Sequence, residues 1–260
     1  MTERVQWEDL PAGLREAVTA RTGPVVTSET VAEGLNCTVA LIIHTRRAGP
    51  LFLKGVRTSD ATGTAGLRAE EHVNGVVAAH GSALRHRFEA AGWRCLAFAH
   101  LDGRHVDLSP GTGDLDAVAR TLERVQSLDA GGLRIPRFAE RFRKYLEPGE
   151  AEALEGAALL HTDANPHNIL VRAGDAYLVD WAMPATGPAW VDPAYTAVRM
   201  MECGQTPADA LRWLHRFPGW RRAEPGAVRA FVNGTCRHWT ATVGEKGAGP
   251  SNARFRSLLG

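Results

Sequence analysis

The sequence is poor in cysteine, which argues against a cysteine metal site and indicates the redox environment of the protein. Four cysteines lie far apart along 260 residues, and none stands at the spacing of a metal site. They are Cys37, Cys95, Cys203 and Cys236. We therefore expect reduced thiols in a cytoplasmic protein.

Long apolar runs and an excess of charge of one sign are also missing. Lys and Arg number 30 and Asp and Glu 29, which leaves a formal net charge of +1 and gives no support for nucleic acid or an anionic membrane as a partner. No apolar run approaches membrane-spanning length, and residues 1–4 lack the apolar region of a signal peptide. No G-x-S-x-G motif predicts a serine nucleophile.

Lysine is scarce as well, because almost every cation other than Lys54, Lys144 and Lys246 is arginine. Lys54 directly follows the apolar run 51–53. A compact ammonium at this position suits a point charge that contacts phosphate oxygens, whereas an exposed lysine at a strand end is the alternative. The downstream motif described next favours the phosphate-binding interpretation.

The sequence does contain a polar segment that runs directly into an apolar strand, residues 161–171. A second short strand, 177–179, ends on Asp180, and a turn of hairpin composition joins the two strands. A hairpin brings the start of its first strand beside the end of its second. We therefore expect Asp163, Asn168 and Asp180 to converge at one end of a two-stranded ribbon.

These residue types suit phosphoryl transfer from a nucleotide. A carboxylate can receive the proton of the acceptor hydroxyl, and hard oxygen ligands can hold Mg²⁺ against the phosphates. The spacing H-x-D-x-x-x-x-N matches the kinase catalytic-loop pattern, and Asp180 takes the place of the acid in Asp-Phe-Gly. The alternative is a polar turn in which Asp163 and Asn165 cap backbone groups. Neither histidine of the segment suits a Mg²⁺ shell, so we expect His161 to brace the loop by hydrogen bonding.

The segment from His161 to Asn168, followed by Val179-Asp180-Trp181, resembles the aminoglycoside phosphotransferase and choline kinase-like family, in which Trp commonly follows the metal-binding acid. The resemblance implies that Asp163 is the catalytic base. It also implies that Asn168 and Asp180 hold Mg²⁺ and that ATP is the phosphoryl donor.

The same resemblance assigns nucleotide contacts to the first part of the chain. The connector that follows the first sheet would pair with adenine through the carbonyl of Ala99 and the amide of Leu101. A helix carboxylate is expected to hold Lys54 toward the phosphates. Glu70 lies near the buried face of the helix predicted after Lys54 and is favoured for this role, with Glu71 as the competing choice.

The first part of the chain is predicted to contain an antiparallel sheet with helices. We expect helices over 7–21 and 67–80, and strands over 25–27, 39–43, 51–56 and 94–99. The loop 33–38 lies where a nucleotide-covering loop would be, but it has only one glycine, so an ordinary hairpin turn is favoured.

From Asp114, which we expect to be the N-cap of a long helix, the apolar periodicity becomes helical. Helices are expected over 114–128, 138–146, 152–160, 206–217 and 228–239, with a further one starting at residue 192. The chain between Asp180 and Trp190 is expected to be irregular. The family also has an acid at the position of Asp192, but N-capping of the helix that continues with Pro193 explains this acid without catalysis.

We therefore predict an α+β, two-lobed protein kinase-like fold, with a nucleotide-binding lobe over residues 1–101 and a helical catalytic and substrate lobe over 102–260. The predicted activity is ATP- and Mg²⁺-dependent transfer of the γ-phosphoryl group to a hydroxyl of a small molecule. An antibiotic is the favoured acceptor, because the family's best-known members inactivate antibiotics. The alternatives are a kinase of a primary metabolite, such as an amino alcohol or sugar, and a non-catalytic nucleotide-binding protein.

The carboxyl-terminal third departs from the expectation for an aminoglycoside enzyme, which needs carboxylates to bind a polycation. Residues 181–260 contain twice as many Lys and Arg as Asp and Glu. We therefore expect a neutral or weakly charged acceptor. Trp190 or Trp239 could provide a stacking surface, although core packing is the favoured role of Trp239.

Overall fold

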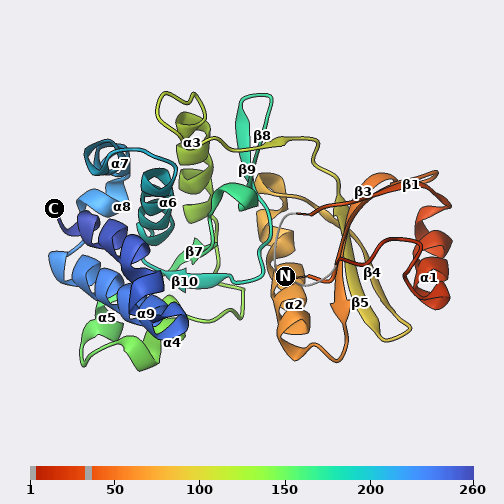
Figure 1. Ribbon diagram of the computed structural model, residues 1–260, viewed down its shortest axis with the longest axis horizontal. Coiled ribbons are helices and arrows are strands. Elements are labelled where there is room, and N and C mark those ends of the chain that lie inside the picture. Colours follow the sequence, from red (N-terminus) through yellow and green to blue (C-terminus); the bar gives the residue numbers. More distant parts are fainter. Residues whose placement is uncertain (1–3, 33–36) are drawn as a thin grey trace. The chain divides into compact units, whose positions relative to one another are not determined.

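The computed structural model describes residues 4–32 and 37–260, and contacts within the chain divide it into two units. The first unit contains residues 1–104 and 179–183, and the second contains 105–178 and 184–260. Each unit is described by itself (Figure 1). The predicted division into lobes at Leu101 stays a prediction, and residues 33–36 of the loop considered as a nucleotide cover lie outside the described residues.

The first unit is built around a five-stranded antiparallel sheet with the order β1-β2-β3-β5-β4. Its elements are α1 (Ala12–Thr22), β1 (Val25–Thr30), β2 (Val39–Thr45), β3 (Gly49–Arg57), α2 (Ala61–Val77), η1 (Ala78–His80), β4 (Leu84–Ala90) and β5 (Trp93–Ala99). Figure 1 shows α1 and α2 on opposite faces of this sheet. A short strand, β6 (Arg104–His105), lies where the units divide.

The alternation of side chains along β3 determines on which face of the sheet Lys54 lies. Leu51 and Leu53 belong to the apolar core that includes Leu14 of α1, whereas Val56 packs with Leu67 of α2. Because successive side chains of a strand point to opposite faces, Lys54 lies on the face that α2 covers. The apolar pattern of one strand thus buries a cation beside a helix.

The sequence-based description of this sheet missed one strand. β4 has exposed charged residues at alternate positions and pairs only with β5, so its composition resembles a polar connection. The turn after it places Ala91 and Gly92 at positive φ, which is the geometry of a tight hairpin. The expected helix over 7–21 also begins later than predicted, at Ala12, directly after Pro11.

The second unit is mostly helical. Its helices are α3 (Leu115–Gln126), α4 (Phe138–Phe142), η2 (Arg143–Tyr145), α5 (Glu150–Ala153), η3 (Pro166–Asn168), α6 (Val191–Glu202), α7 (Pro207–Leu214), α8 (Pro218–Arg221), α9 (Pro225–Arg256) and η4 (Ser257–Leu259). Its strands are β7 (Ala158–Leu160), β8 (Ile169–Arg172), β9 (Asp175–Leu178) and β10 (Ala185–Gly187). The predicted α+β class is confirmed.

The helix expected over 152–160 is wrong beyond Ala153, and the irregular chain expected before Trp190 is wrong where β10 forms. Helix α5 ends at Ala153, and β7 pairs antiparallel with β10. The cause lies partly at Gly156, where a Cβ would lie 2.3 Å from the backbone of Gly187. The two segments therefore approach too closely for any side chain at that position, and the periodicity of the apolar residues does not reveal this.

Two further expectations for the second unit are wrong. Asp114 directly precedes α3, but its carboxylate accepts from the amide of Asp107 at 2.9 Å rather than from the helix. Trp190 is 5% exposed and packs edge-on against Phe231, with ring centroids 5.4 Å apart. This burial contradicts a role for Trp190 as an open stacking surface.

The last helix combines two helical segments. Gly244 has φ of 77° inside α9, a conformation that favours glycine, and it breaks the helix there. Trp239, which lies before this break, donates from Nε1 to the hydroxyl of Ser251 at 3.0 Å. This bond ties the two segments together and agrees with the packing role favoured for Trp239.

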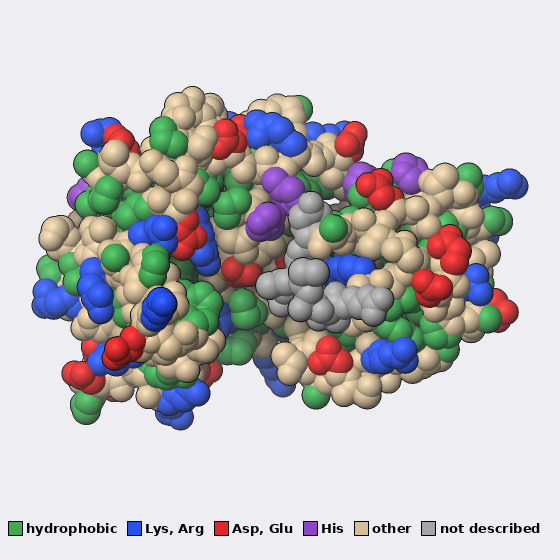
Figure 2. Space-filling model, in the orientation of Figure 1, with side chains coloured by type: hydrophobic (Ala, Val, Ile, Leu, Met, Phe, Trp, Pro, Cys, Tyr) green, Lys and Arg blue, Asp and Glu red, His purple; other side chains and the backbone are tan. Residues whose placement is uncertain are grey.

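None of the helices in the described part of the chain is long and apolar enough to cross a membrane. On the face of each unit drawn in Figure 2, cationic and anionic side chains are interspersed rather than gathered by sign.

Candidate active site

The first unit brings Lys54 together with two carboxylates. Its ammonium lies 2.8 Å from an oxygen of Glu70 and 2.5 Å from Oδ1 of Asp180. The backbone amide of Trp181 also donates to Glu70. The structure therefore pairs Lys54 with Glu70 rather than with Glu71, which contacts Arg87 and Arg94 instead.

Helical geometry explains the choice between these two adjacent acids. Leu67, Glu70, Val73 and Val77 lie three or four residues apart and are all buried, so Glu70 is on the face of α2 that packs on the sheet. Glu71 is rotated by about 100° from it, as expected from 3.6 residues per turn. The side chain of Glu70 is 6% exposed, as is that of Lys54.

Burial and charge act in opposite directions on this cluster. Burial alone would lower the pKa of Lys54, but the carboxylates of Glu70 and Asp180 outweigh it and raise that pKa, so the lysine stays charged. Burial raises the pKa of Glu70 against the lowering effect of Lys54. Burial also raises the pKa of the neighbouring Cys37 thiol to about 12, which keeps that thiol protonated at neutral pH.

Asp180 has a backbone conformation that few non-glycine residues adopt, with φ of 62°. Residues held in this region cluster at functional sites, where the surrounding structure compensates for the strain. In this chain, the ion pair with Lys54 is one such compensation.

The connector proposed to contact adenine follows β5. The carbonyl of Ala99 accepts a hydrogen bond from the hydroxyl of Ser82, and a carbonyl oxygen has a second lone pair for another donor. The amide of His100 donates to Pro50 at 3.2 Å. Among the described residues, no group accepts from the amide of Leu101. The adenine contacts of Ala99 and Leu101 stay a prediction.

The second unit holds the catalytic-loop candidates, and Asp163 is at the centre of their hydrogen bonds. Its Oδ1 accepts from the side-chain amide of Asn165 and its Oδ2 from that of Asn168, each at 3.0 Å. The backbone amide of Asp163 donates to Nδ1 of His161 at 3.2 Å. His161 therefore braces the loop, as expected.

Asn168 is placed by η3, which begins with Pro166 after an Asn165 cap that accepts from the amide of His167 at 2.9 Å. The side-chain nitrogen of Asn168 donates both to the backbone carbonyl and to the carboxylate of Asp163. Its side-chain oxygen has no donor among the described residues. This oxygen is a hard ligand of the kind that Mg²⁺ prefers.

Asp192 contradicts the prediction that it is a helix cap. Helix α6 begins at Val191, and Asp192, inside its first turn, is completely buried. Its carboxylate accepts from the backbone amides of His161 at 2.7 Å and Thr162 at 2.8 Å. Burial raises the pKa of Asp192 and these two donors oppose the rise. Asp192 thus anchors the loop that carries Asp163, a role that local sequence could not reveal.

Thr162 is the strained residue of this loop, with φ of 65°. Besides the bond from its amide to Asp192, its hydroxyl accepts from the guanidinium of Arg141 on α4. Arg141 is largely buried, which lowers its pKa. Sequence reasoning missed Arg141, because nothing in the spacing of α4 separates this arginine from its neighbours.

The predicted hairpin is present as β8–β9, with Ile169 opposite Leu178, although β9 covers Asp175–Leu178 rather than the expected 177–179. It packs on α3, where the hydroxyl of Thr121 donates to the carbonyl of Ala176 at 2.7 Å. Asp163 and Asn168 are brought together in the second unit, whereas Asp180 is grouped with Lys54 in the first. The convergence of all three at one site stays a prediction.

A family model supports the resemblance over one segment of the chain. A family model described as the phosphotransferase enzyme family matches residues 155–225, which include the catalytic-loop candidates, the hairpin and Asp192. A search of curated protein sequences finds no match.

Solved structures match nearly the whole chain at low identity. A thermostable mutant of an aminoglycoside phosphotransferase is 12% identical with a TM-score of 0.61, covering 94% of this chain and 98% of that one. Choline kinase from Streptococcus pneumoniae is 12% identical with a TM-score of 0.62, covering 94% and 96%. An amicoumacin kinase in complex with AMP-PNP, Ca²⁺ and Ami is 11% identical with a TM-score of 0.56, covering 89% and 87%.

At these identities the structural matches establish the fold, and the family match is confined to one segment. The chain therefore has the protein kinase-like fold of the aminoglycoside phosphotransferases and choline kinases, and its residues 155–225 match the phosphotransferase enzyme family.

Proposed function

We propose that this protein is a small-molecule kinase, which transfers the γ-phosphoryl group of ATP to a hydroxyl of its acceptor. The observation that carries the proposal is the buried Lys54–Glu70 ion pair together with Asp163, whose carboxylate is held by two asparagine amides. A buried lysine that stays charged suits phosphate binding, and an oriented carboxylate suits the base role.

Each of these residues has a distinct part in the proposed reaction. Lys54 contacts nonbridging phosphate oxygens, and Glu70 keeps its ammonium in place. Asp163 accepts the proton of the acceptor hydroxyl as the new oxygen–phosphorus bond forms and the bond to the departing ADP breaks. Asp192 and His161 fix the backbone of the loop, so the carboxylate does not need to be reoriented during the reaction.

The ligands available fit Mg²⁺ rather than a softer metal. Within residues 4–32 and 37–260, no group of three or more His, Cys, Asp or Glu side chains is arranged to hold a metal ion. Mg²⁺ usually binds through one or two protein oxygens together with substrate phosphates and water. The side-chain oxygen of Asn168 and the carboxylate of Asp180 would supply those oxygens, and the ion would neutralise charge on the phosphates.

Antibiotics are the favoured acceptors, and the similar structures include an aminoglycoside phosphotransferase and an amicoumacin kinase. A primary-metabolite acceptor is the second candidate, since choline kinase is similar to the same extent. The purified protein should be incubated with ATP, Mg²⁺ and a panel of hydroxylated antibiotics, amino alcohols and sugars. Mass spectrometry should detect one phosphoryl group added to an acceptor, and omission of Mg²⁺ should abolish the product. No phosphorylated acceptor and no acceptor-stimulated ADP release across the panel would contradict the proposal.

A further inference from the structure

The sheet of the first unit presents two arginines to α2 in addition to Lys54. On β5, Leu96 and Phe98 pack with α2, so Arg94, two residues before Leu96, points to the same face. Arg87 of β4 lies directly opposite Leu96 in the register and shares that face. Both guanidinium groups therefore lie beside the helix.

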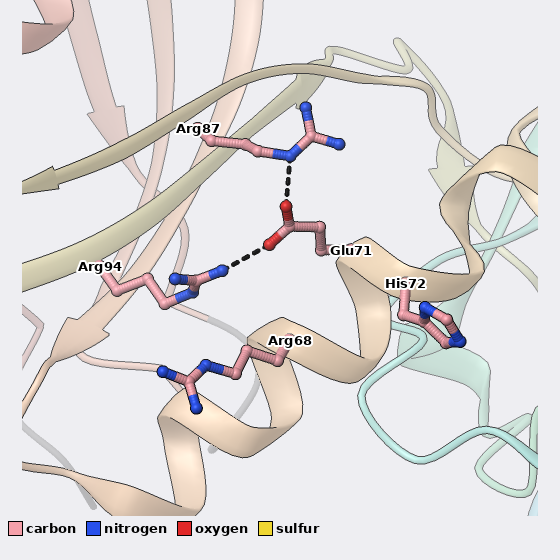
Figure 3. A pocket seen from close by; sticks show the side chains of 5 residues that line it. All are labelled: Arg68, Glu71, His72, Arg87 and Arg94. Carbon is pink, nitrogen blue, oxygen red and sulfur yellow. Dashed lines mark hydrogen bonds and ion pairs between the residues drawn. The ribbon is translucent and has the colours of Figure 1, made fainter. Parts of the chain in front are cut away.

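The helix presents a matching polar face. Arg68, Glu71 and His72 lie three and four residues apart on α2, which places them on one side of it. Together with Arg87 and Arg94 they line a pocket of about 440 Å³. Figure 3 shows that Arg87 and Arg94 reach Glu71 from the sheet, while Arg68 lies one turn earlier on the helix.

The charges that line this pocket are unbalanced, with three guanidinium groups and a single carboxylate. Glu71 accepts from Nε of Arg87 and from one terminal nitrogen of Arg94. The other terminal nitrogen of Arg94 donates to Glu89 at 2.9 Å, outside the pocket lining. No described carboxylate pairs with Arg68.

Donor groups also exceed the acceptors that the described residues supply. Glu71 accepts from Nε of Arg87. The terminal nitrogens of Arg87 have no acceptor among the described residues. The buried Nε of Arg94 has no hydrogen-bond partner in the described part of the chain. A compact anion with several acceptor oxygens would satisfy these donors, and planar guanidinium groups match phosphate geometry through paired hydrogen bonds.

We propose that this pocket is a second anion site, which binds a phosphoryl group of a free small molecule through Arg68, Arg87 and Arg94. The site is distinct from the nucleotide-phosphate contact of Lys54, because Lys54 pairs with Glu70 on another face of α2. An anion held there connects α2 to β4 and β5. The helix that carries Glu70 is thereby held against the sheet when the pocket is filled.

Isothermal titration of the full chain with inorganic phosphate tests the site, at an ionic strength kept constant with sodium chloride. Arg68→Gln and Arg87→Gln should each weaken phosphate binding about tenfold, the lower range for a charge-assisted hydrogen bond at a partly exposed site. Both side chains are exposed, so these variants are expected to fold, which a melting curve checks. Arg46→Gln removes an exposed cation from the β2–β3 turn of the same unit and should leave binding within twofold of wild type.

A Lys54→Ala variant separates the proposed pocket from the nucleotide site. Phosphate affinity that persists in Lys54→Ala and falls in Arg68→Gln supports the proposal. Affinity that falls only in Lys54→Ala, affinity that is equal in all of the variants, or a wild type that binds no phosphate would overturn it. The test does not depend on catalytic activity, so it stands or falls separately from the proposed kinase reaction.

Discussion

Asp163 is expected to serve the acceptor, whereas Lys54 is expected to serve the nucleotide, so substitutions of the two should affect different measurements. We predict that Asp163→Asn lowers kcat by about 10²–10⁴-fold, the usual contribution of a general base. Nucleotide affinity should stay within a few-fold of wild type, because the hydrogen bonds of the Asp163 carboxylate to described residues stay within its own loop. Steady-state kinetics and calorimetry measure the two quantities.

Asp175→Asn is a matched control, since Asp175 is an exposed acid at the start of β9. This variant should keep the wild-type kcat. If Asp163→Asn retains activity within a few-fold of wild type, another group takes the proton and the assignment of Asp163 is wrong.

Asp180 has two possible routes to nucleotide binding, through a metal ion and through its ion pair with Lys54. We predict that Asp180→Ala weakens Mg²⁺-nucleotide binding more than Asn168→Ala does, because a carboxylate carries charge and an amide does not. With Mg²⁺ removed by a chelator, Asp180→Ala and wild type should bind ATP about equally. A difference that persists without the metal would mean that Asp180 acts by positioning Lys54.

The role of Glu70 could be predicted from the sequence, whereas that of Asp192 could not. Glu70 could be favoured over Glu71 because helical periodicity is visible in the sequence, and the structure does pair it with Lys54. Asp192 could not be interpreted in the same way. Its hydrogen-bond donors lie 30 and 31 residues away in the chain, so its position before Pro193 suggested only a cap.

At the scale of secondary structure, the junction of β7 and β10 depends on one glycine. A Cβ at residue 156 would meet the backbone of Gly187, which cannot move as a flexible side chain would. We predict that Gly156→Ala lowers the free energy of unfolding by about 1–3 kcal/mol, the usual cost of overpacking. Gly132→Ala is the control, because nothing lies within 4 Å of a Cβ there. Equal stability of the two variants in chemical denaturation would show that the junction can relax.

Helix α2 positions Glu70 and begins with a side-chain cap. Asp60 accepts from the amide of Gly63 at 2.9 Å, so Asp60→Ala should cost about 1 kcal/mol of unfolding free energy. Ser59→Ala, at an exposed neighbour, should change it by less than about 0.5 kcal/mol. Urea denaturation followed by circular dichroism compares them. An Asp60→Ala variant as stable as Ser59→Ala would mean that tertiary packing alone fixes the start of α2.

The strands that could be predicted from the sequence are those in which apolar residues occupy the buried positions. The strands β2, β3 and β5 are rich in buried apolar residues and were found as apolar runs. The edge strand β4 carries charged side chains, and β7 is only three residues long and follows a helical turn. Both depend on pairing with distant partners, which local composition does not encode.

For the molecule as a whole, the resemblance of one segment predicted a fold that similar structures share over nearly the whole chain. This was possible because the pattern of a polar loop, a hairpin and an acid is local and specific. The acceptor could not be predicted in the same way, because acceptor-binding residues are dispersed through the fold and vary among proteins that share it.

The charges of residues 181–260 support a prediction about that acceptor. Of their five acids, Asp192 is buried on the loop of His161, Glu202 contacts Arg199 and Arg254, and Asp209 contacts Arg212. Only the exposed acids Glu224 and Glu245 have no such ion pair among the described residues. Capture of a polycation needs several carboxylates, because an exposed ion pair contributes only about 0–1 kcal/mol.

We therefore predict a neutral or weakly charged acceptor, whose KM changes little between low and high salt. Screening reduces attraction between exposed charges as the Debye length falls from about 30 Å at 0.01 M to about 8 Å at physiological ionic strength. A KM that stays within about twofold over this range, with ATP saturating, would agree with recognition by shape and hydrogen bonds. The control is the KM for Mg²⁺-ATP, measured over the same range, because it reports any general effect of salt on the enzyme. Efficient turnover of a multiply charged aminoglycoside, with a KM that rises steeply with salt, would show instead that carboxylates outside this segment recognise a cationic acceptor.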